Sequence, residues 1–259
     1  ITLIRFCQVV PNMSSFKDYV ASQSYGPLPP ALPLAHSTGA TEFESILDAG
    51  QLTPGDCKFF QLPLSYFFYG RAAFRVLPDE QDSKYHAQPA LYPACILLDS
   101  QRLPACAGQL PFDSGAFPRG RLAPNLLKAE LDLYALYTDP DCLRRCVVAF
   151  YEGNEAYFEG RPRWSPVPST CGAVSNYLDL LNTRNTNRTD DRAMTLEVRF
   201  DQPIFLNSDT VVGVVMPKAW MEGRPFLLDS IKKLGLKEKV HFYTTSLGAD
   251  TEHMGVLRQ

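Results

Sequence analysis

The strongest limit on the fold comes from four consecutive aromatic residues that end in a glycine and an arginine. They lie in the stretch LPLSYFFYGRAAFR, which runs from Leu62 to Arg75. A strand inside a sheet accounts for the aromatic side chains, but it does not account for Arg71 and Arg75 after them. The stretch therefore predicts a strand or a strand–helix junction, and it leaves open whether its end serves structure or chemistry.

The length and composition favour one domain with a proper core. The chain has 259 residues, and 45% of them are hydrophobic. We expect a single domain over residues 1–259, in which prolines make residues 1–33 an extended lead-in. The net charge of −3 gives no overall attraction to nucleic acid or to an anionic membrane. Apolar runs such as Val211 to Met216 are far shorter than the roughly 20 residues that span a bilayer, so no membrane partner is expected.

The seven cysteines show no metal-binding or redox spacing. No two of them are separated by the two residues that are typical of zinc ribbons and redox motifs. Cys142 and Cys146 could share a helix face, but two nearby ligands do not make a metal site. We therefore expect no metal, and we expect free thiols in a reducing cytoplasm.

Apolar periodicity predicts strands and helices along the whole chain. Helices are expected at residues 40–50, 125–137, 171–183 and 223–235. Strands are expected at residues 32–40, 93–101, 193–200, 203–206, 211–217 and 239–245. Thr41 can cap the first helix and Gly50 can end it. Because the strands concentrate late in the chain, we expect an α+β fold rather than a doubly wound sheet.

Residues 102–125 are rich in Pro, Gly and Asp and predict a long ordered loop. Such a loop in a compact domain is more often functional than decorative. Its segment PFDSGAF, Pro111 to Phe117, is either a tight turn held by Asp113 or a loop that lines a cleft.

Several common enzyme classes lose support because their motifs are missing. The sequence has no Gly-x-Gly-x-x-Gly after a strand, no Walker phosphate loop, no Gly-x-Ser-x-Gly elbow and no His-Glu-x-x-His. Rossmann enzymes, P-loop enzymes, serine hydrolases of the elbow type and zincins are therefore disfavoured.

Three separated elements occur in a recognisable order. His36 ends an early strand, the aromatic stretch follows about thirty residues later, and Glu197 lies alone in the late strand MTLEVRF. This order resembles the ADP-ribosyltransferase superfamily, in particular its His-Tyr-Glu branch and the DarT-type bacterial toxins. The segments FFYGRAAFR and PFDSGAF are also similar to bacterial proteins of that fold. The likeness spans residues 34–217 and implies a split β-sheet core surrounded by helices and long loops.

The resemblance implies a reaction and a set of roles. NAD would be the co-substrate, and its bond between nicotinamide and ribose would break through a cation-like transition state that Glu197 stabilises. Tyr69, or else Tyr66, would stack on nicotinamide. The remaining roles are hydrogen bonds to ribose and contacts to the pyrophosphate. The resemblance assigns the first role to His36 with Ser37 or Thr38, and the second to Arg71 or Arg75.

The acceptor of ADP-ribose is expected to be a macromolecule, with DNA or RNA favoured over protein. Thr195 stands where relatives that modify arginine carry Glu, a residue that assists the protein acceptor. Its replacement by Thr disfavours modification of arginine. The polar loop Asn182 to Arg192 lies where the family recognises its target, and its three arginines suit phosphate contacts. Tyr177 is the nearest aromatic residue for stacking on a base. A cytoplasmic toxin or anti-phage effector is the setting implied, with an antitoxin or inhibitor as a further partner.

Plainer interpretations remain open for each of these residues. Glu197 could be an exposed strand residue, and the aromatic residues could be core. Arg71 and Arg75 could form weak surface ion pairs. The same fold could hydrolyse NAD with water as the acceptor, or could bind a ligand without catalysis. An enzyme with Cys171 as the nucleophile ranks last, since the sequence shows no His partner.

Overall fold

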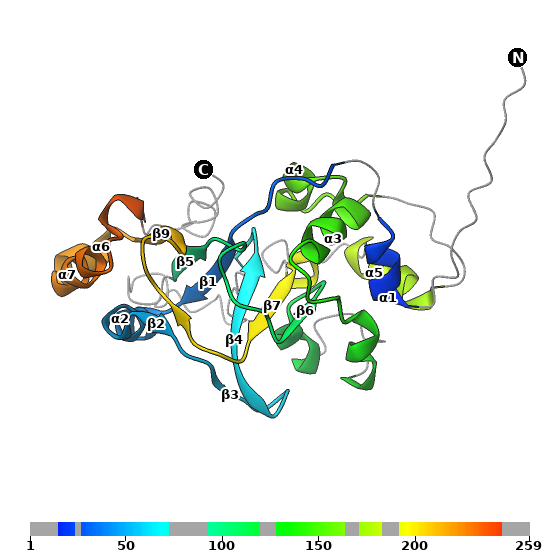
Figure 1. Cartoon of the computed structure of the whole chain (residues 1–259), viewed down its shortest axis with the longest axis horizontal. Coiled ribbons are helices and arrows are strands. Elements are labelled where there is room, and N and C mark those ends of the chain that lie inside the picture. Colours follow the sequence, from blue (N-terminus) through cyan, green and yellow to red (C-terminus); the bar gives the residue numbers. More distant parts are fainter. Residues whose placement is uncertain are drawn as a thin grey trace, which may run out of the picture.

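A mixed β-sheet runs through the middle of the molecule, with helices gathered at its two sides (Figure 1). The computed structural model describes residues 15–23, 27–72, 93–119, 128–163, 171–182 and 192–244. In sheet order the strands are β10 (Val240–Tyr243), β9 (Val211–Pro217), β5 (Ala94–Leu98), β1 (Leu34–Thr38), β4 (Leu62–Tyr69), β7 (Glu197–Phe200) and β6 (Gly108–Leu110). Only β10 and β9 pair in parallel; the other neighbours along this path are antiparallel.

Two short pairings lie outside this order. Strand β3 (Gly55–Cys57) forms a hairpin with the start of β4. Strands β2 (Gln51–Leu52) and β8 (Ile204–Phe205) form a separate two-stranded sheet. The mixture of strands and helices confirms the expected class at this coarse level. The reasoning from late strands was wrong, however, because β1, β4 and β5 all lie in the first hundred residues.

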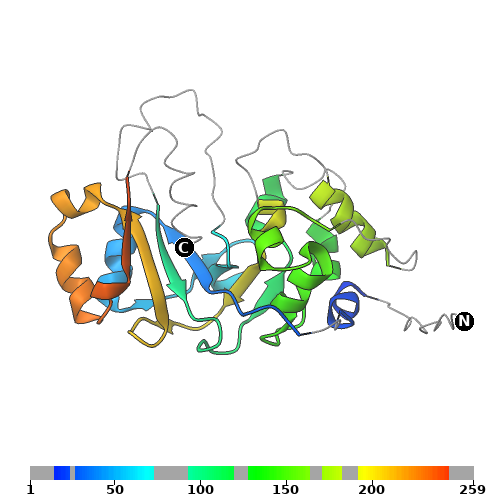
Figure 2. The ribbon, with the colours of Figure 1, turned by 90° about the horizontal axis from the view of Figure 1, so that it is seen from above.

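The helices form two groups, one at each side of the sheet (Figures 1 and 2). Beside β9 lie α2 (Ala40–Ala49), α6 (Ala219–Gly223) and α7 (Phe226–Lys233). Toward β7 and β6 lie α1 (Phe16–Ala21), α3 (Cys142–Tyr151), α4 (Asn154–Phe158) and α5 (Gly172–Asn182). No helix in the described ranges is long and apolar enough to cross a membrane.

Helix α2 shows how local sequence makes these elements. Its buried residues Ala40, Phe43 and Leu47 recur at helical spacing and face the core. Gly50 ends the helix in a left-handed conformation with φ of 64°, as predicted. The predicted cap was wrong, because the helix begins one residue before Thr41 and Gly39 is its N-cap.

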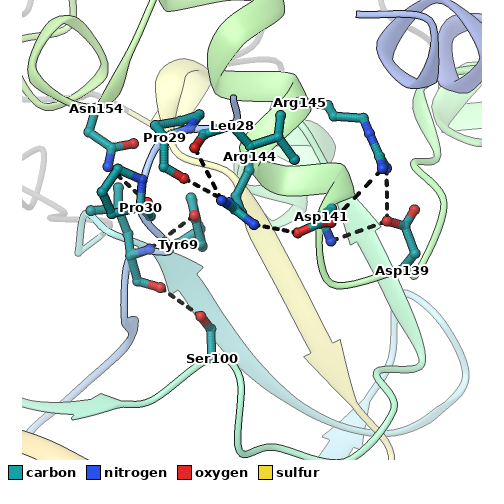
Figure 3. Close-up of polar contacts among 11 residues, drawn as sticks. Leu28, Pro29, Pro30, Tyr69, Ser100, Asp139, Asp141, Arg144, Arg145 and Asn154 are labelled. Carbon is teal, nitrogen blue, oxygen red and sulfur yellow. Dashed lines mark hydrogen bonds and ion pairs between the residues drawn. The ribbon is translucent and has the colours of Figure 1, made fainter. Parts of the chain in front are cut away.

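The chain that leads into β1 is tied to the body of the molecule by hydrogen bonds (Figure 3). Arg144 in α3 donates from Nε to the carbonyl oxygen of Pro29 and from Nη2 to that of Leu28. Ser100 donates to the carbonyl oxygen of Leu32. Residues 28–33 form neither helix nor strand, whereas α1 is a helix inside the predicted extended lead-in. Residues 1–14 and 24–26 lie outside the described residues.

Two further expectations need correction. The predicted amphipathic helix at 125–137 is a 3₁₀ helix over Lys128–Tyr134 in its described part. The predicted loop at 102–125 contains strand β6 and the 3₁₀ helix Ser114–Arg119, so PFDSGAF is more than a turn. The expectation of a single domain stays a prediction.

Candidate functional site

Gly70 and Arg71, which follow β4, both have structural roles. Gly70 has a φ of 65°, and a Cβ there would collide with the side chain of Leu32, so only glycine fits. Arg71 is 6% exposed and donates from Nη1 to the carbonyl oxygen of Tyr157. The guanidinium that was expected to bind pyrophosphate is therefore held against α4. Arg75 lies outside the described residues.

The register of the sheet decides which predicted residues share a face. In β4 and β7, Tyr66 lies opposite Arg199 and Phe68 lies opposite Glu197. Antiparallel partners point to the same side of a sheet, and consecutive residues point to opposite sides. Tyr66, Phe68, Glu197 and Arg199 therefore share one face, and Phe67 lies on the other.

His36 and Tyr69 lie on the face opposite to Glu197. His36 is the partner of Ile96 in β5, and its ring lies 5.3 Å from that of Phe67. Tyr69 shares this face because it is two residues from Phe67 in the same strand. His36, Tyr69 and Glu197 were expected to converge around one cleft, and this expectation was wrong. Side chains alternate along each strand, so His36 and Tyr69 point away from the face that carries Glu197.

Each of these two residues has a structural partner. Nδ1 of His36 donates to the carbonyl oxygen of Tyr66 at 2.9 Å. Burial lowers the pKa of His36 below 6.5, against the opposing effect of that hydrogen bond. The Tyr69 hydroxyl accepts a hydrogen bond from the N–H of Leu32 (Figure 3). Its ring is 1% exposed, so nicotinamide has no access to it in this conformation.

The neighbours of His36 follow the same alternation. Ser37 lies opposite Cys95 and shares the face of Ala35 and Phe68, whereas Thr38 lies opposite Ala94 on the face of His36. Of the two predicted neighbouring donors, only Ser37 is on the face that carries Glu197.

Glu197 is the centre of a buried polar cluster, and it is not the exposed strand residue that the plainer interpretation expected. Its exposure is 0%. The backbone N–H of Ser114 donates to Oε2 at 2.8 Å. The Ser114 hydroxyl lies 2.9 Å from Oε1 and 2.7 Å from Oε2. Nε of Arg199 lies 3.6 Å from Oε1, which forms an ion pair within the same strand.

The protonation of Glu197 is balanced near neutral pH. Burial, with a smaller effect of nearby Asp113 in the same direction, raises the pKa of its carboxyl from 4.5 to a net value of about 7. Arg199 and the hydrogen bonds from Ser114 oppose this shift because they favour the charged form. A carboxyl group with such a pKa can exchange a proton or keep a charge at neutral pH.

Arg199 is fixed by its neighbours. Its guanidinium lies over the ring of Phe60 at 4.0 Å, a cation–π contact. A Cβ on Gly108 would lie 2.5 Å from Nη2 of Arg199, so glycine leaves the space that the guanidinium occupies. The side chain of Arg199 is 11% exposed, and its Nη1 has no hydrogen-bond partner among the described residues. The cluster thus holds a carboxylate and a guanidinium that are both largely withdrawn from water.

Cys57 and Tyr66 extend the cluster toward the surface. The Tyr66 hydroxyl donates to the Cys57 sulfur at 2.8 Å, and the N–H of Phe60 donates to the same sulfur at 3.4 Å. Burial raises the pKa of Cys57, but these hydrogen bonds and one from Phe59 outweigh it, so the pKa falls below 9.0. Glu197 acts on both groups through its charge, raising the pKa of each.

The expected contacts to nucleic acid have little support in the described residues. Arg184 and Arg188 lie outside them. Arg192 is 1% exposed, and its carbonyl oxygen accepts a hydrogen bond from Asp113. The hydroxyl of the fully buried Tyr177 donates to Pro111, so this ring is not placed to stack on a base. Cys171 is also buried.

Sequence reasoning missed three members of the cluster, namely Cys57, Ser114 and Arg199. The only sequence signal for Arg199 was its position two residues after Glu197, which places both on one face of a strand. Ser114 lies in PFDSGAF, a segment that was singled out without a role. Cys57 carried no signal.

The described residues contain no group of three or more His, Cys, Asp or Glu side chains that could hold a metal ion. Comparison of the chain with protein-family models, with curated proteins and with solved structures found no match.

Proposed function

We propose that this chain cleaves the bond between nicotinamide and ribose in NAD and transfers ADP-ribose to a macromolecule. The observation that carries the proposal is the Glu197 cluster: a buried carboxylate, held by Ser114 and Arg199, on a strand next to the aromatic strand β4. The resemblance of the sequence to ADP-ribosyltransferases requires a carboxylate in this element.

The arrangement of the central strands also supports the proposal. The elements with His36, the aromatic stretch and Glu197 are β1, β4 and β7, which are neighbours in the sheet. β1 pairs with β4 over two residue pairs but with β5 over five, so β1 and β4 part after Ala35. A sheet that opens between central strands agrees with the split sheet that the resemblance implies.

In the proposed reaction, the bond from ribose C1′ to the nicotinamide nitrogen breaks, and its electron pair leaves with nicotinamide. Positive charge develops on the ribose, and the carboxylate of Glu197 stabilises it once the site opens, since this carboxylate is 0% exposed in the present conformation. Tyr66 and Phe68 share the face of Glu197, so Tyr66 replaces Tyr69 as our candidate for stacking on nicotinamide. An O–H or N–H group of the acceptor, with DNA or RNA favoured over protein, then bonds to C1′ through its oxygen or nitrogen and loses its proton to solvent.

A second candidate is a binding module without catalysis. It is favoured by the complete burial of Glu197, both of whose oxygens already have partners in Ser114 and Arg199. In that case the cluster would stabilise the fold, and the chain would release no nicotinamide from NAD.

The test is incubation with NAD that is labelled in its adenylate phosphate, together with DNA, RNA and cell protein in separate reactions. The proposal predicts that one macromolecular fraction retains the label, with DNA or RNA ahead of protein, and that Glu197→Gln abolishes this. Free labelled ADP-ribose in the absence of any acceptor would indicate NAD hydrolysis instead. If no nicotinamide is released under any condition, the proposal is wrong.

A further inference from the structure

The segment PFDSGAF places a serine directly on the carboxylate of Glu197. Ser114 lies 83 residues before Glu197 in the chain and is 2% exposed. It supplies a backbone N–H and a hydroxyl to the same carboxylate, at distances of 2.7 to 2.9 Å. Two donors from one residue fix the plane of the carboxylate as well as its position.

The hydroxyl of Ser114 can contact Glu197 in both protonation states, but its hydrogen bond to the charged carboxylate is the stronger one. It has one proton to donate, and its Oγ lies within hydrogen-bond distance of both carboxylate oxygens. With charged Glu197, the hydroxyl donates to one oxygen. With protonated Glu197, the carboxyl O–H can donate to Oγ. The backbone N–H, in contrast, can only donate and therefore favours the charged form.

The segment around Ser114 is itself held in place. Pro111 accepts a hydrogen bond from Tyr177 in α5, and Phe112 is fully buried in the core. The N–H of Asp113 donates to the carbonyl oxygen of Arg192, five residues before Glu197. The Asp113 carboxylate accepts a hydrogen bond from the N–H of Gly115 at 2.7 Å. Ser114 is thus presented to Glu197 by a segment that is anchored to its neighbours at residues 111–113 and closed by a local turn at Gly115.

We infer that Ser114 is a positioning residue, which holds the carboxylate of Glu197 in one orientation and favours its charged form. The inference deepens the proposed function and rests on it where catalysis is concerned. It gives PFDSGAF a role that neither a tight turn nor a cleft-lining loop describes.

The other groups that act on Glu197 by charge come from three strands and from the PFDSGAF segment. Arg199 in β7 favours the charged form, and Asp113 in the PFDSGAF segment disfavours it. Cys57 in β3 and Tyr66 in β4 also interact with the charge of Glu197. Ser114, in contrast, is uncharged and contacts the carboxylate directly. Removing its hydroxyl therefore changes the hydrogen bonds to Glu197 but none of the charges around it.

The first test needs no substrate. The carboxyl of Glu197 is titrated by ¹³C NMR in the full chain, with Glu197→Gln to assign the signal. We expect Ser114→Ala to raise the pKa so that the ionisation constant changes about tenfold, the effect of one hydrogen bond to a charged group. Ser114→Thr keeps the hydroxyl and should restore the pKa, and Ser114→Cys, a weaker donor, should fall between them.

Ser65 provides a matched control. It is a buried serine in β4, 6% exposed, whose hydroxyl donates to the carbonyl oxygen of Phe200 and not to Glu197. Ser65→Ala should leave the pKa of Glu197 unchanged. The inference is overturned if Ser114→Ala does not move that pKa, or if Ser65→Ala moves it equally.

The second test uses labelled NAD and separates this inference from the proposed function. In Ser114→Ala, kcat should fall with little change in KM, and the acid limb of the pH–rate profile should move to higher pH by the same amount as the carboxyl pKa. If the wild-type chain does not cleave NAD, the proposed function fails, while the NMR titration still decides whether Ser114 sets the ionisation of Glu197.

Discussion

Replacing Glu197 with glutamine should remove a specific part of the pH dependence of stability. Glu197 is fully buried, and its pKa rises from 4.5 to about 7 on folding. A raised carboxyl pKa means that the folded chain binds a proton which the unfolded chain has already lost. The stabilising effect is therefore complete below pH 4.5, declines as the pH rises, and is lost above pH 7.

The magnitude follows from the size of this shift. A gap of about 2.5 pH units, at about 1.4 kcal/mol for each unit, gives about 3 kcal/mol between the two limits. Other groups also titrate in this range, among them His36 with its lowered pKa. They are common to the wild type and to Glu197→Gln, so the difference between the two chains isolates Glu197.

The assay is equilibrium unfolding in urea at pH 5, 6, 7 and 8 for both chains. We expect the free energy of unfolding of the wild type, relative to Glu197→Gln, to fall by roughly 2–3 kcal/mol from pH 5 to pH 8. A difference that stays flat would show that Glu197 titrates near its ordinary value. A difference that rises with pH would show that Arg199 and Ser114 outweigh burial.

Two further predictions concern the neighbours of Glu197. Iodoacetamide should alkylate Cys57 several-fold faster than Cys106 at pH 7.5, because both thiols are partly exposed but the pKa of Cys57 is lowered and burial raises that of Cys106. Tyr66→Phe should slow the alkylation of Cys57 and leave that of Cys106 unchanged, because the hydrogen bond from Tyr66 lowers the pKa of Cys57 alone. Equal labelling rates by mass spectrometry of the peptides would refute this. Gly108→Ala should lower the free energy of unfolding by about 1–2 kcal/mol, since its Cβ would displace the guanidinium of Arg199. Gly55→Ala is the control, because a Cβ there would meet no atom within 4 Å in the part of the chain that the structure describes. Similar unfolding curves for the two variants would contradict the packing described for Arg199.

The elements with a clear apolar period could be predicted from the sequence. Helices α2, α5 and α7 and strands β1, β5 and β9 lie within the predicted ranges. Each of them buries a stripe or a run of side chains whose spacing is visible in the sequence. The segment Lys128–Tyr134 has the same apolar spacing but forms a 3₁₀ helix, so periodicity alone did not fix the type of helix.

The candidate site could be predicted only in part. Glu197 was identified, but its neighbours depend on strand register, which pairs β4 with β7 so that Tyr66 and not Tyr69 shares its face. A shift of one residue in that register would have brought Tyr69 to Glu197. Ser114 contacts Glu197 across 83 residues of chain, and no local pattern reports such a contact.

The burial of Glu197 also could not be predicted from the sequence. Flanked by Leu196 and Val198, a strand glutamate is expected to alternate onto a polar, solvated face. In the structure, Ser114 and Arg199 cover that face at Glu197 and leave the carboxyl 0% exposed. Whether a face is covered depends on how segments distant in sequence pack, and PFDSGAF gives no sign of this by itself.

The release of nicotinamide from NAD by purified wild-type chain, compared with Glu197→Gln and with Ser65→Ala, tests the proposed function most directly. We expect release by the wild type and by Ser65→Ala, and a loss on the order of a hundredfold or more in Glu197→Gln, the usual effect of removing a preorganised stabilising group. Absence of release by the wild type, or an unchanged rate in Glu197→Gln, would contradict a catalytic role for this carboxylate.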